Sequence, residues 1–193
     1  MQDNMSFATA QADMRQAYAG GVIGILVSGT VWLLAGCVAL YRTPHDAVLA
    51  LLAGGVLIHP LAVLLAKATG RSGAHTRGNP LGQLSMEATV WMLLGIAIAY
   101  GVSLWRTNLF FPAMLFIIGG RYGTFATVYG MRLYWAFGAA LAASGYLVAI
   151  NAASMAVGAF TGGAIELVFA AVLYASLRSR ETVAPAPGGS AAS

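Results

Sequence analysis

The sequence predicts an all-α membrane protein, a polytopic bundle of about six transmembrane helices with both termini in the cytoplasm. Of its 193 residues, 59% are hydrophobic and 8% are charged, whereas a soluble domain carries about 25% charged residues. A water-soluble globule of this composition would expose far more contiguous apolar surface than soluble monomers tolerate. In lipid, the backbone of such a chain is satisfied in long helices. A soluble enzyme or binding domain is therefore excluded.

Six apolar runs are long enough to cross a membrane, which takes about 20 helical residues. Bounded by polar, Gly or Pro residues, they cover residues 17–41, 44–67, 80–104, 108–130, 132–151 and 158–177. The third run has a clear start, because Asn79 is a good N-cap and Pro80 suits the first helical turn. The break between the fourth and fifth runs depends on Gly130 and Arg132 alone.

The two ends of the chain differ from the predicted bundle, residues 17–178. Residues 1–16 are polar and contain no hydrophobic core, so we expect no cleavable signal peptide. Residues 179–193 are rich in Pro, Ala, Gly and Ser. Such a tail buries too little apolar surface to offset its ordering entropy, and we expect it to be disordered.

The basic residues give the bundle an orientation, because cytoplasmic loops carry an excess of Lys and Arg. Seven of the ten lie on the N-terminal side of the predicted membrane, namely Arg15, Lys67, Arg71, Arg77, Arg132, Arg178 and Arg180. Two, Arg42 and Arg106, lie on the other side. We therefore expect both termini to be cytoplasmic. The net charge of +4 fits contact with lipid phosphates better than binding of nucleic acid.

Several kinds of chemistry have no support in the sequence. The single Cys37 permits neither an intramolecular disulfide nor a thiol metal site. There is no paired-His or H-E-x-x-H motif and no acidic cluster, so we expect no metal and no cofactor. The spacings of a Walker ATPase and of a G-x-S-x-G hydrolase are also missing.

Ionisable residues inside the apolar runs are the main functional candidates, because each is costly in lipid without a partner or solvent. His59, Glu87 and Arg121 should lie at one depth in the cytoplasmic half, whereas Glu166 should lie near the opposite face and apart from them. His59 precedes Pro60, which frees a helix carbonyl. This His could move protons or could simply bond a neighbouring helix.

Arg121 begins a cationic and aromatic stripe on one helix face, which includes Tyr129 and Arg132. An Arg fork beside Tyr hydroxyls is a good receiver for a carboxylate or phosphate. Alternatively, Glu87 and Arg121 form an ion pair that only holds two helices together. The candidate substrate-binding residues are His59, Glu87, Arg121, Tyr122, Tyr129 and Arg132.

Two further features indicate partners. The loop GRSGAHTRGN and its flank supply basic residues for contact with lipid headgroups or anions, namely Lys67, Arg71, His75 and Arg77. The pairs Gly20/Gly24 and Gly158/Gly162 have the spacing of helix-packing glycines, within one chain or between the copies of a homo-oligomer.

The strings HPLAVLLAKATGRSGAH, NPLGQLSMEATVWM and FFPAMLFIIGGRYGTFATVYGMRLYW resemble a family of small, uncharacterised bacterial multi-pass membrane proteins, grouped as a domain of unknown function. The resemblance covers residues 14–151. It implies a bacterial inner-membrane location and carries over no catalytic or binding residue.

Three function classes remain open. The leading hypothesis is a transporter or channel-like carrier of a small anionic or amphipathic solute, bound in a cytoplasm-facing polar pocket. The second is an intramembrane enzyme that modifies a lipid or isoprenoid, with His59 or Glu87 as general base and Arg121 holding a phosphate. The third is a non-catalytic scaffold or assembly subunit, in which buried polar residues only set helix register.

Overall fold

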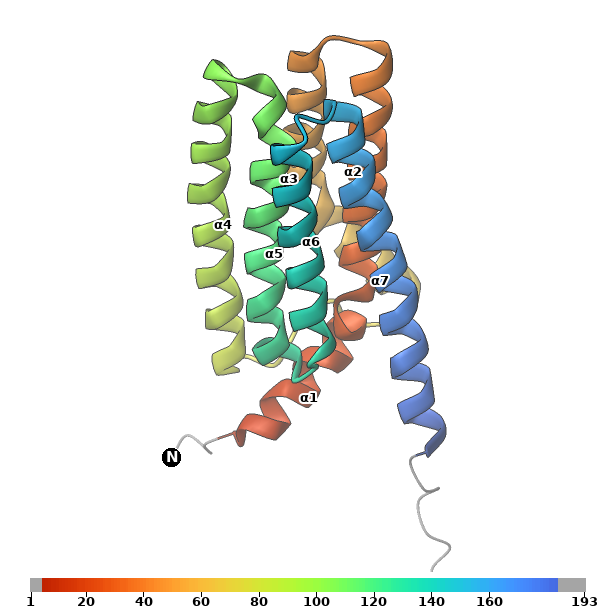
Figure 1. Cartoon of the computed structure of the whole chain (residues 1–193). Helices are drawn as coiled ribbons and strands as arrows, with labels where there is room; N and C mark the ends of the chain where they lie inside the picture. Colours follow the sequence, from red (N-terminus) through yellow and green to blue (C-terminus); the bar gives the residue numbers. More distant parts are fainter. Residues whose placement is uncertain (1–4, 184–193) are drawn as a thin grey trace, which may run out of the picture.

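The computed structural model describes residues 5–183, and every regular element in that range is a helix. Within it, six helices are long and apolar enough to cross a membrane. They stand side by side, with the shorter α1 lying obliquely beneath one end of the bundle (Figure 1). The end of α7 lies at that same end of the bundle (Figure 1). The expected six-span architecture is therefore confirmed.

The helix bounds follow the apolar runs of the sequence closely. The elements are α1 (Phe7–Tyr18), η1 (Ala19–Gly21), α2 (Val22–Tyr41), α3 (Pro44–Ala68), α4 (Pro80–Trp105), η2 (Thr107–Leu109), α5 (Phe110–Tyr129), α6 (Leu133–Ile150) and α7 (Met155–Val183). The break between α5 and α6 falls at Gly130, which adopts the left-handed conformation (φ 62°). Helix α7 runs past the expected end at residue 178, and residues 184–193 of the predicted tail lie outside the described residues.

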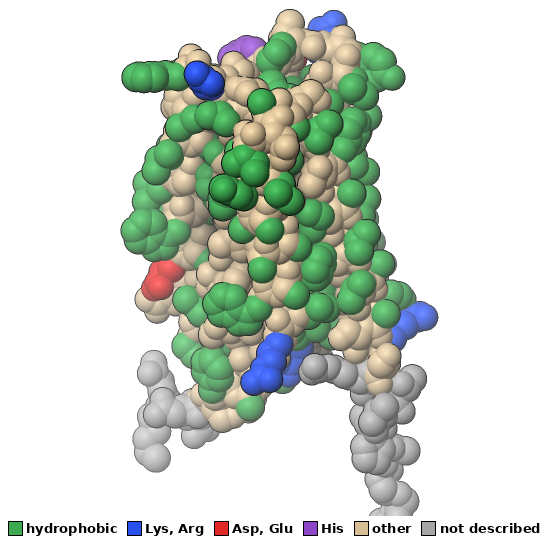
Figure 2. Space-filling model, in the orientation of Figure 1, with side chains coloured by type: hydrophobic (Ala, Val, Ile, Leu, Met, Phe, Trp, Pro, Cys, Tyr) green, Lys and Arg blue, Asp and Glu red, His purple; other side chains and the backbone are tan. Residues whose placement is uncertain are grey.

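Neighbouring helices in space are not all neighbours in sequence. The extensive contacts join α3 to α2, α2 to α7, α7 to α6, α6 to α5 and α5 to α4. Helices α3 and α4 stand at the two ends of this series and are the least buried spans. On the face shown in Figure 2, hydrophobic side chains cover the height of the bundle, and the Lys and Arg side chains that are visible lie near its two ends. That distribution is the one a lipid environment requires.

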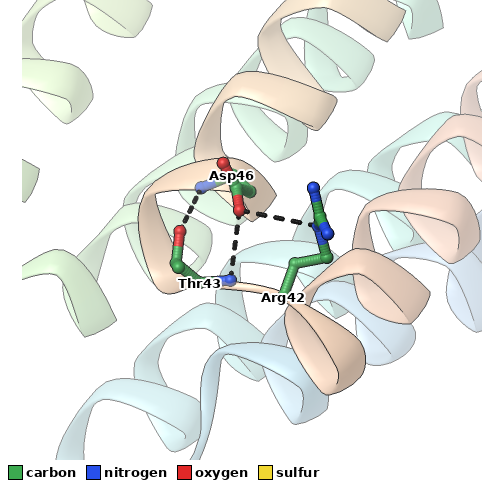
Figure 3. A network of polar contacts seen from close by, with 3 residues as sticks. All are labelled: Arg42, Thr43 and Asp46. Atoms are coloured by element: carbon green, nitrogen blue, oxygen red, sulfur yellow. Dashed lines mark hydrogen bonds and ion pairs between the residues drawn. The ribbon is translucent and has the colours of Figure 1, made fainter.

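The turn between α2 and α3 is held by a capping box (Figure 3). The Thr43 hydroxyl accepts from the Asp46 backbone N–H at 3.2 Å, and the Asp46 carboxylate accepts from the Thr43 N–H at 3.3 Å. Arg42 approaches the same carboxylate at 3.9 Å, both side chains being accessible to solvent. An exposed ion pair contributes little, so the cap is the main local reason why α3 begins at Pro44.

The first apolar run divides into α1 and α2 at a sharp kink. Ala19, Gly20 and Gly21 all have positive φ (50°, 59° and 88°). The Tyr134 hydroxyl donates to the Gly20 carbonyl at 2.5 Å, and a Cβ on Gly21 would overlap that hydroxyl. Helix α2 alone, with 20 residues, is long enough to span the membrane. The polar α1 can therefore lie across the end of the bundle.

Asn79 caps α4 and also ties α1 to it. Its Oδ1 accepts from the Leu81 N–H at 2.9 Å, as the sequence predicts for an N-cap. Its Nδ2 donates to the Ala10 carbonyl at 3.0 Å and to the Asp13 carboxylate at 2.7 Å. One buried side chain thus satisfies the start of α4 and fixes the position of α1.

Helices α5 and α6 cross with their backbones in contact at two glycines. A Cβ built on Gly138 would lie 2.5 Å from the Gly119 carbonyl oxygen, and one on Gly119 would lie 2.7 Å from the Gly138 oxygen. Gly158 and Gly162 pack within the chain, against Phe111 and Trp32. Glycines at these positions allow an approach that any larger side chain would prevent.

Candidate functional site

A carboxyl group lies at the centre of the bundle. Glu166 of α7 is 0% exposed. Its Oε1 accepts a hydrogen bond from the Tyr122 hydroxyl of α5 at 3.1 Å. Its Oε2 is buried and has no hydrogen-bond partner. The expectation that Glu166 lies near a membrane face is wrong, because it bonds Tyr122 in the middle of α5. No hydrogen bond or ion pair joins it to His59, Glu87 or Arg121.

Glycines allow α2 to approach this carboxyl. A Cβ on Gly29 would lie 3.2 Å from the Glu166 Cβ, and a Cβ on Gly163 would lie 3.0 Å from the Gly29 carbonyl. Ser28, also buried, approaches the carboxyl from α2 but forms no hydrogen bond with Oε2. The acid is therefore enclosed by a close crossing of α2 and α7, with hydroxyl groups as its polar neighbours.

Stacked rings run from the carboxyl towards the α1–α2 kink. This aromatic column consists of Phe169, Phe137, Tyr122, Tyr134 and Tyr129. Phe137 stacks on Phe169 at 4.5 Å and on Tyr122 at 4.0 Å between centroids, and Tyr129 stacks on Tyr134 at 5.5 Å. The aromatic column connects α5, α6 and α7 through contacts that rigid rings make at low entropy cost.

The far end of the aromatic column holds α1 in place. Tyr134 bonds the kink at Gly20, as described above, and Arg15 of α1 donates to the Tyr129 carbonyl at 2.6 Å. Gln11 donates to the Thr127 carbonyl at 2.8 Å. Two of the carbonyls at the C-terminal end of α5 are thereby satisfied by α1 side chains.

Arg121 points the other way, towards α4. Its Nη1 lies 2.7 Å from the Met92 Sδ, and its guanidinium lies 5.3 Å from the centre of the Phe125 ring. No carboxylate of residues 5–179 pairs with it. In the described part of the chain, Glu166 Oε2 is the buried side-chain polar atom that lacks a hydrogen-bond partner. The Arg121 nitrogens that form no hydrogen bond are therefore not fully buried. A cation in apolar surroundings thus remains open to an anion.

The proposed ion pair between Glu87 and Arg121 is absent. Glu87 lies exposed on α4 and accepts a hydrogen bond from Gln83 at 3.1 Å. His59 is exposed on α3, and Arg132 is exposed before α6. The rings of Tyr122 and Tyr129 both stack on Tyr134, whereas no hydrogen bond or ion pair links His59, Glu87 and Arg121 to one another.

The basic loop between α3 and α4 is fastened to α1. Thr76 donates to the Asp13 carboxylate from its N–H at 3.0 Å and from its hydroxyl at 2.9 Å. His75 Nδ1 and the Tyr18 hydroxyl share a hydrogen bond of 2.9 Å. Burial raises the pKa of Asp13, but the hydrogen bonds from Asn79 and Thr76 outweigh it, so the pKa lies below its ordinary value.

A polar hollow of about 630 Å³ separates this loop from α1. Arg71 lines it and donates weakly to the Gln16 carbonyl at 3.5 Å, whereas Lys67 and Arg77 are exposed. Of the four basic groups expected to contact headgroups or anions, Lys67 and Arg77 are exposed. The other two, Arg71 and His75, are half-buried and form hydrogen bonds to α1.

Known families were compared with the chain. The family described as "Family of unknown function (DUF7010)" matches residues 7–176, from the start of α1 into the last turns of α7. The chain belongs to this family. Neither the curated proteins nor the solved structures contain a match. Membership of DUF7010 agrees with the resemblance to an uncharacterised membrane family.

In this DUF7010 chain, sequence reasoning placed Glu166 outside the candidate site and missed Ser28 and Tyr134 as its neighbours. A signal for Glu166 was present, because Gly162, Glu166 and Ala170 recur at four-residue intervals on one face of α7. A face of small residues is the face that packs against other helices. An acid on that face points into the bundle.

Proposed function

We propose that this protein is a small membrane carrier that moves an anionic or amphipathic solute and holds its negative group at Arg121. The observation that carries the proposal is that Arg121 lies half-buried between α5 and α4, with no carboxylate partner in residues 5–179. An unpaired cation in lipid is costly and commonly marks a substrate pathway.

Arg121 and Glu166 could have neutralised each other, yet the fold keeps them apart. Tyr122 turns to Glu166, while the adjacent Arg121 turns to Met92 on α4. A bundle that used these residues only for helix register would gain from pairing them, because an ion pair in apolar surroundings reduces the cost of both charges. Their separation supports a separate role for each.

The neighbours of Arg121 indicate what kind of anion would fit. Met92 and Phe125 offer a thioether and a ring beside the guanidinium. An anion with an apolar or aromatic body could bond the fork and pack against these side chains at once. This combination supports an amphipathic anion in preference to a strongly hydrated inorganic one.

Orientation and location follow from the charge distribution and from the family resemblance. The end of the bundle crossed by α1 has the excess of Lys and Arg, which supports the proposal that it faces the cytoplasm. The membrane is proposed to be the bacterial inner membrane. In this orientation, both termini are cytoplasmic.

Uptake into proteoliposomes tests the carrier. The probes are radiolabelled benzenesulfonate, an aromatic anion that cannot cross lipid as a neutral acid, and inorganic phosphate. We expect saturable uptake of benzenesulfonate that falls at least about tenfold in Arg121→Leu, because a hydrogen-bonded charge contributes about 1.5–3 kcal/mol. Arg121→Lys should fall in between, since it keeps the charge but loses the fork.

The matched control is Arg106→Leu, which removes an exposed Arg from the opposite end of the bundle. It should transport as the wild type does. Each variant must show the same gel-filtration profile and helical circular dichroism as the wild type. Absence of uptake by the wild type, or equal uptake by a well-folded Arg121→Leu variant, would contradict the proposal.

A further inference from the structure

We propose that Glu166 is a proton-binding site, a carboxylic acid that holds a proton in the closed bundle and releases it when the crossing of α2 and α7 opens. The proton site stands on the geometry around Glu166 alone. Its role in coupling solute movement to a proton gradient rests on the proposed carrier function.

The surroundings of Glu166 offer no compensating charge. The polar groups that face it are the Tyr122 hydroxyl from α5 and the Ser28 hydroxyl from α2. From α6, Tyr134 and Phe137 stack on Tyr122, and α7 itself adds apolar neighbours. No Lys, Arg or His of residues 5–179 pairs with the carboxyl. A fully buried carboxylate without a cation costs far more than the neutral acid.

The hydrogen bonds also match a neutral acid. A carboxylate accepts at both oxygens and has about four lone-pair sites to satisfy. Here Oε1 accepts one bond, from Tyr122, and Oε2 accepts none. In the protonated acid, Oε1 is the carbonyl oxygen that accepts from Tyr122, and Oε2 carries the hydrogen. Ser28, the other polar neighbour, carries a hydroxyl oxygen that can accept this hydrogen.

Release of the proton requires a change in structure. Ionised Glu166 needs water or a cation, and neither can reach an atom that is 0% exposed while α2 and α7 stay in contact at Gly29 and Gly163. Opening of this crossing therefore favours the ionised form, and protonation favours closure. A carrier with such an acid would bind one proton and release it again in each cycle.

Infrared difference spectroscopy of the full chain in lipid bilayers tests the proton site directly. We expect the C=O stretch of a protonated carboxylic acid in apolar surroundings to persist at neutral pH in the wild type. It should disappear in Glu166→Gln, which keeps an acceptor for Tyr122. The matched control is Glu87→Gln, which removes the exposed acid of α4 and should retain the band. A neutral-pH spectrum in which Glu166→Gln removes no such band would overturn the proposal.

A second measurement tests coupling. Uptake of benzenesulfonate into proteoliposomes is followed with and without an imposed proton gradient. The wild type and Glu87→Gln should respond to the gradient, whereas Glu166→Gln should give the same uptake in both conditions. Uptake by the wild type that ignores the gradient would overturn the coupling. If the wild type moves no probe at all, the carrier proposal fails, and the infrared band still decides the proton site.

Discussion

At the scale of single residues, the proposed functions depend on four polar side chains on the apolar helices α2, α5 and α7. They are Ser28, Arg121, Tyr122 and Glu166. Each loses hydration when it enters lipid, so each needs a partner or a ligand. Tyr122 is the pivotal residue, because its hydroxyl supplies the hydrogen bond that Glu166 receives and its ring stacks on Phe137.

Replacement of Tyr122 by Phe should destabilise the protein while leaving the ring stack intact. The change leaves both oxygens of Glu166 without a donor, and a buried polar group without its partner costs about 1–3 kcal/mol. Thermal unfolding in detergent would measure the loss. Tyr146→Phe, at an exposed position on α6, is the control and should unfold as the wild type does. Equal unfolding of both variants would show that the hydrogen bond contributes nothing.

At the scale of helices, close crossings at glycine position the site. Gly119 and Gly138 bring α5 against α6, and Gly29 and Gly163 bring α2 against α7. These crossings place Tyr122 and Glu166 within hydrogen-bonding distance. The geometry of the carboxyl therefore depends on backbones that have no side chain between them.

Gly138→Ala should separate α5 from α6. Its new methyl group would lie 2.5 Å from the Gly119 carbonyl, and overpacking of this kind costs about 1–3 kcal/mol or more. The control is Gly120→Ala one residue after Gly119, where a Cβ meets nothing within 4 Å. Its stability should equal or slightly exceed that of the wild type, because Ala favours the helix. If Gly138→Ala and Gly120→Ala unfold at the same temperature, the helices do not cross as closely as described.

The sequence was sufficient to predict the spanning helices but not their rotation about their own axes. Lipid requires long apolar helices, so the six runs and the Asn79 cap were readable directly. Because these helices are apolar on all sides, no pattern shows which face is buried. For that reason the meeting of His59, Glu87 and Arg121 was expected, and the inward direction of Glu166 was missed. The sequence likewise did not reveal α1, because residues 1–16 contain no long apolar run.

At the scale of the whole molecule, the two ends of the bundle differ in their number of basic residues. Reporter fusions should place both termini in the cytoplasm, because the end crossed by α1 has the excess of Lys and Arg. Green fluorescent protein joined before Met1 or after Ser193 should fluoresce in bacterial cells. Alkaline phosphatase joined to a chain truncated at Asn151, in the loop between α6 and α7, should be active outside. Opposite compartments for the two terminal fusions would contradict the six-span arrangement.

The contact between α2 and α7 also bears on biogenesis. Of the spans described, α2 leaves the ribosome first and α7 leaves it last, and their contact is the most extensive in the bundle. During synthesis, α2 enters the bilayer before its partner α7 has been made. Until α7 is inserted, α3 is the helix with which α2 makes extensive contact. A chain truncated before Met155 would therefore insert its earlier spans but lack α7, the main packing partner of α2. We expect such a chain to be degraded in the cell.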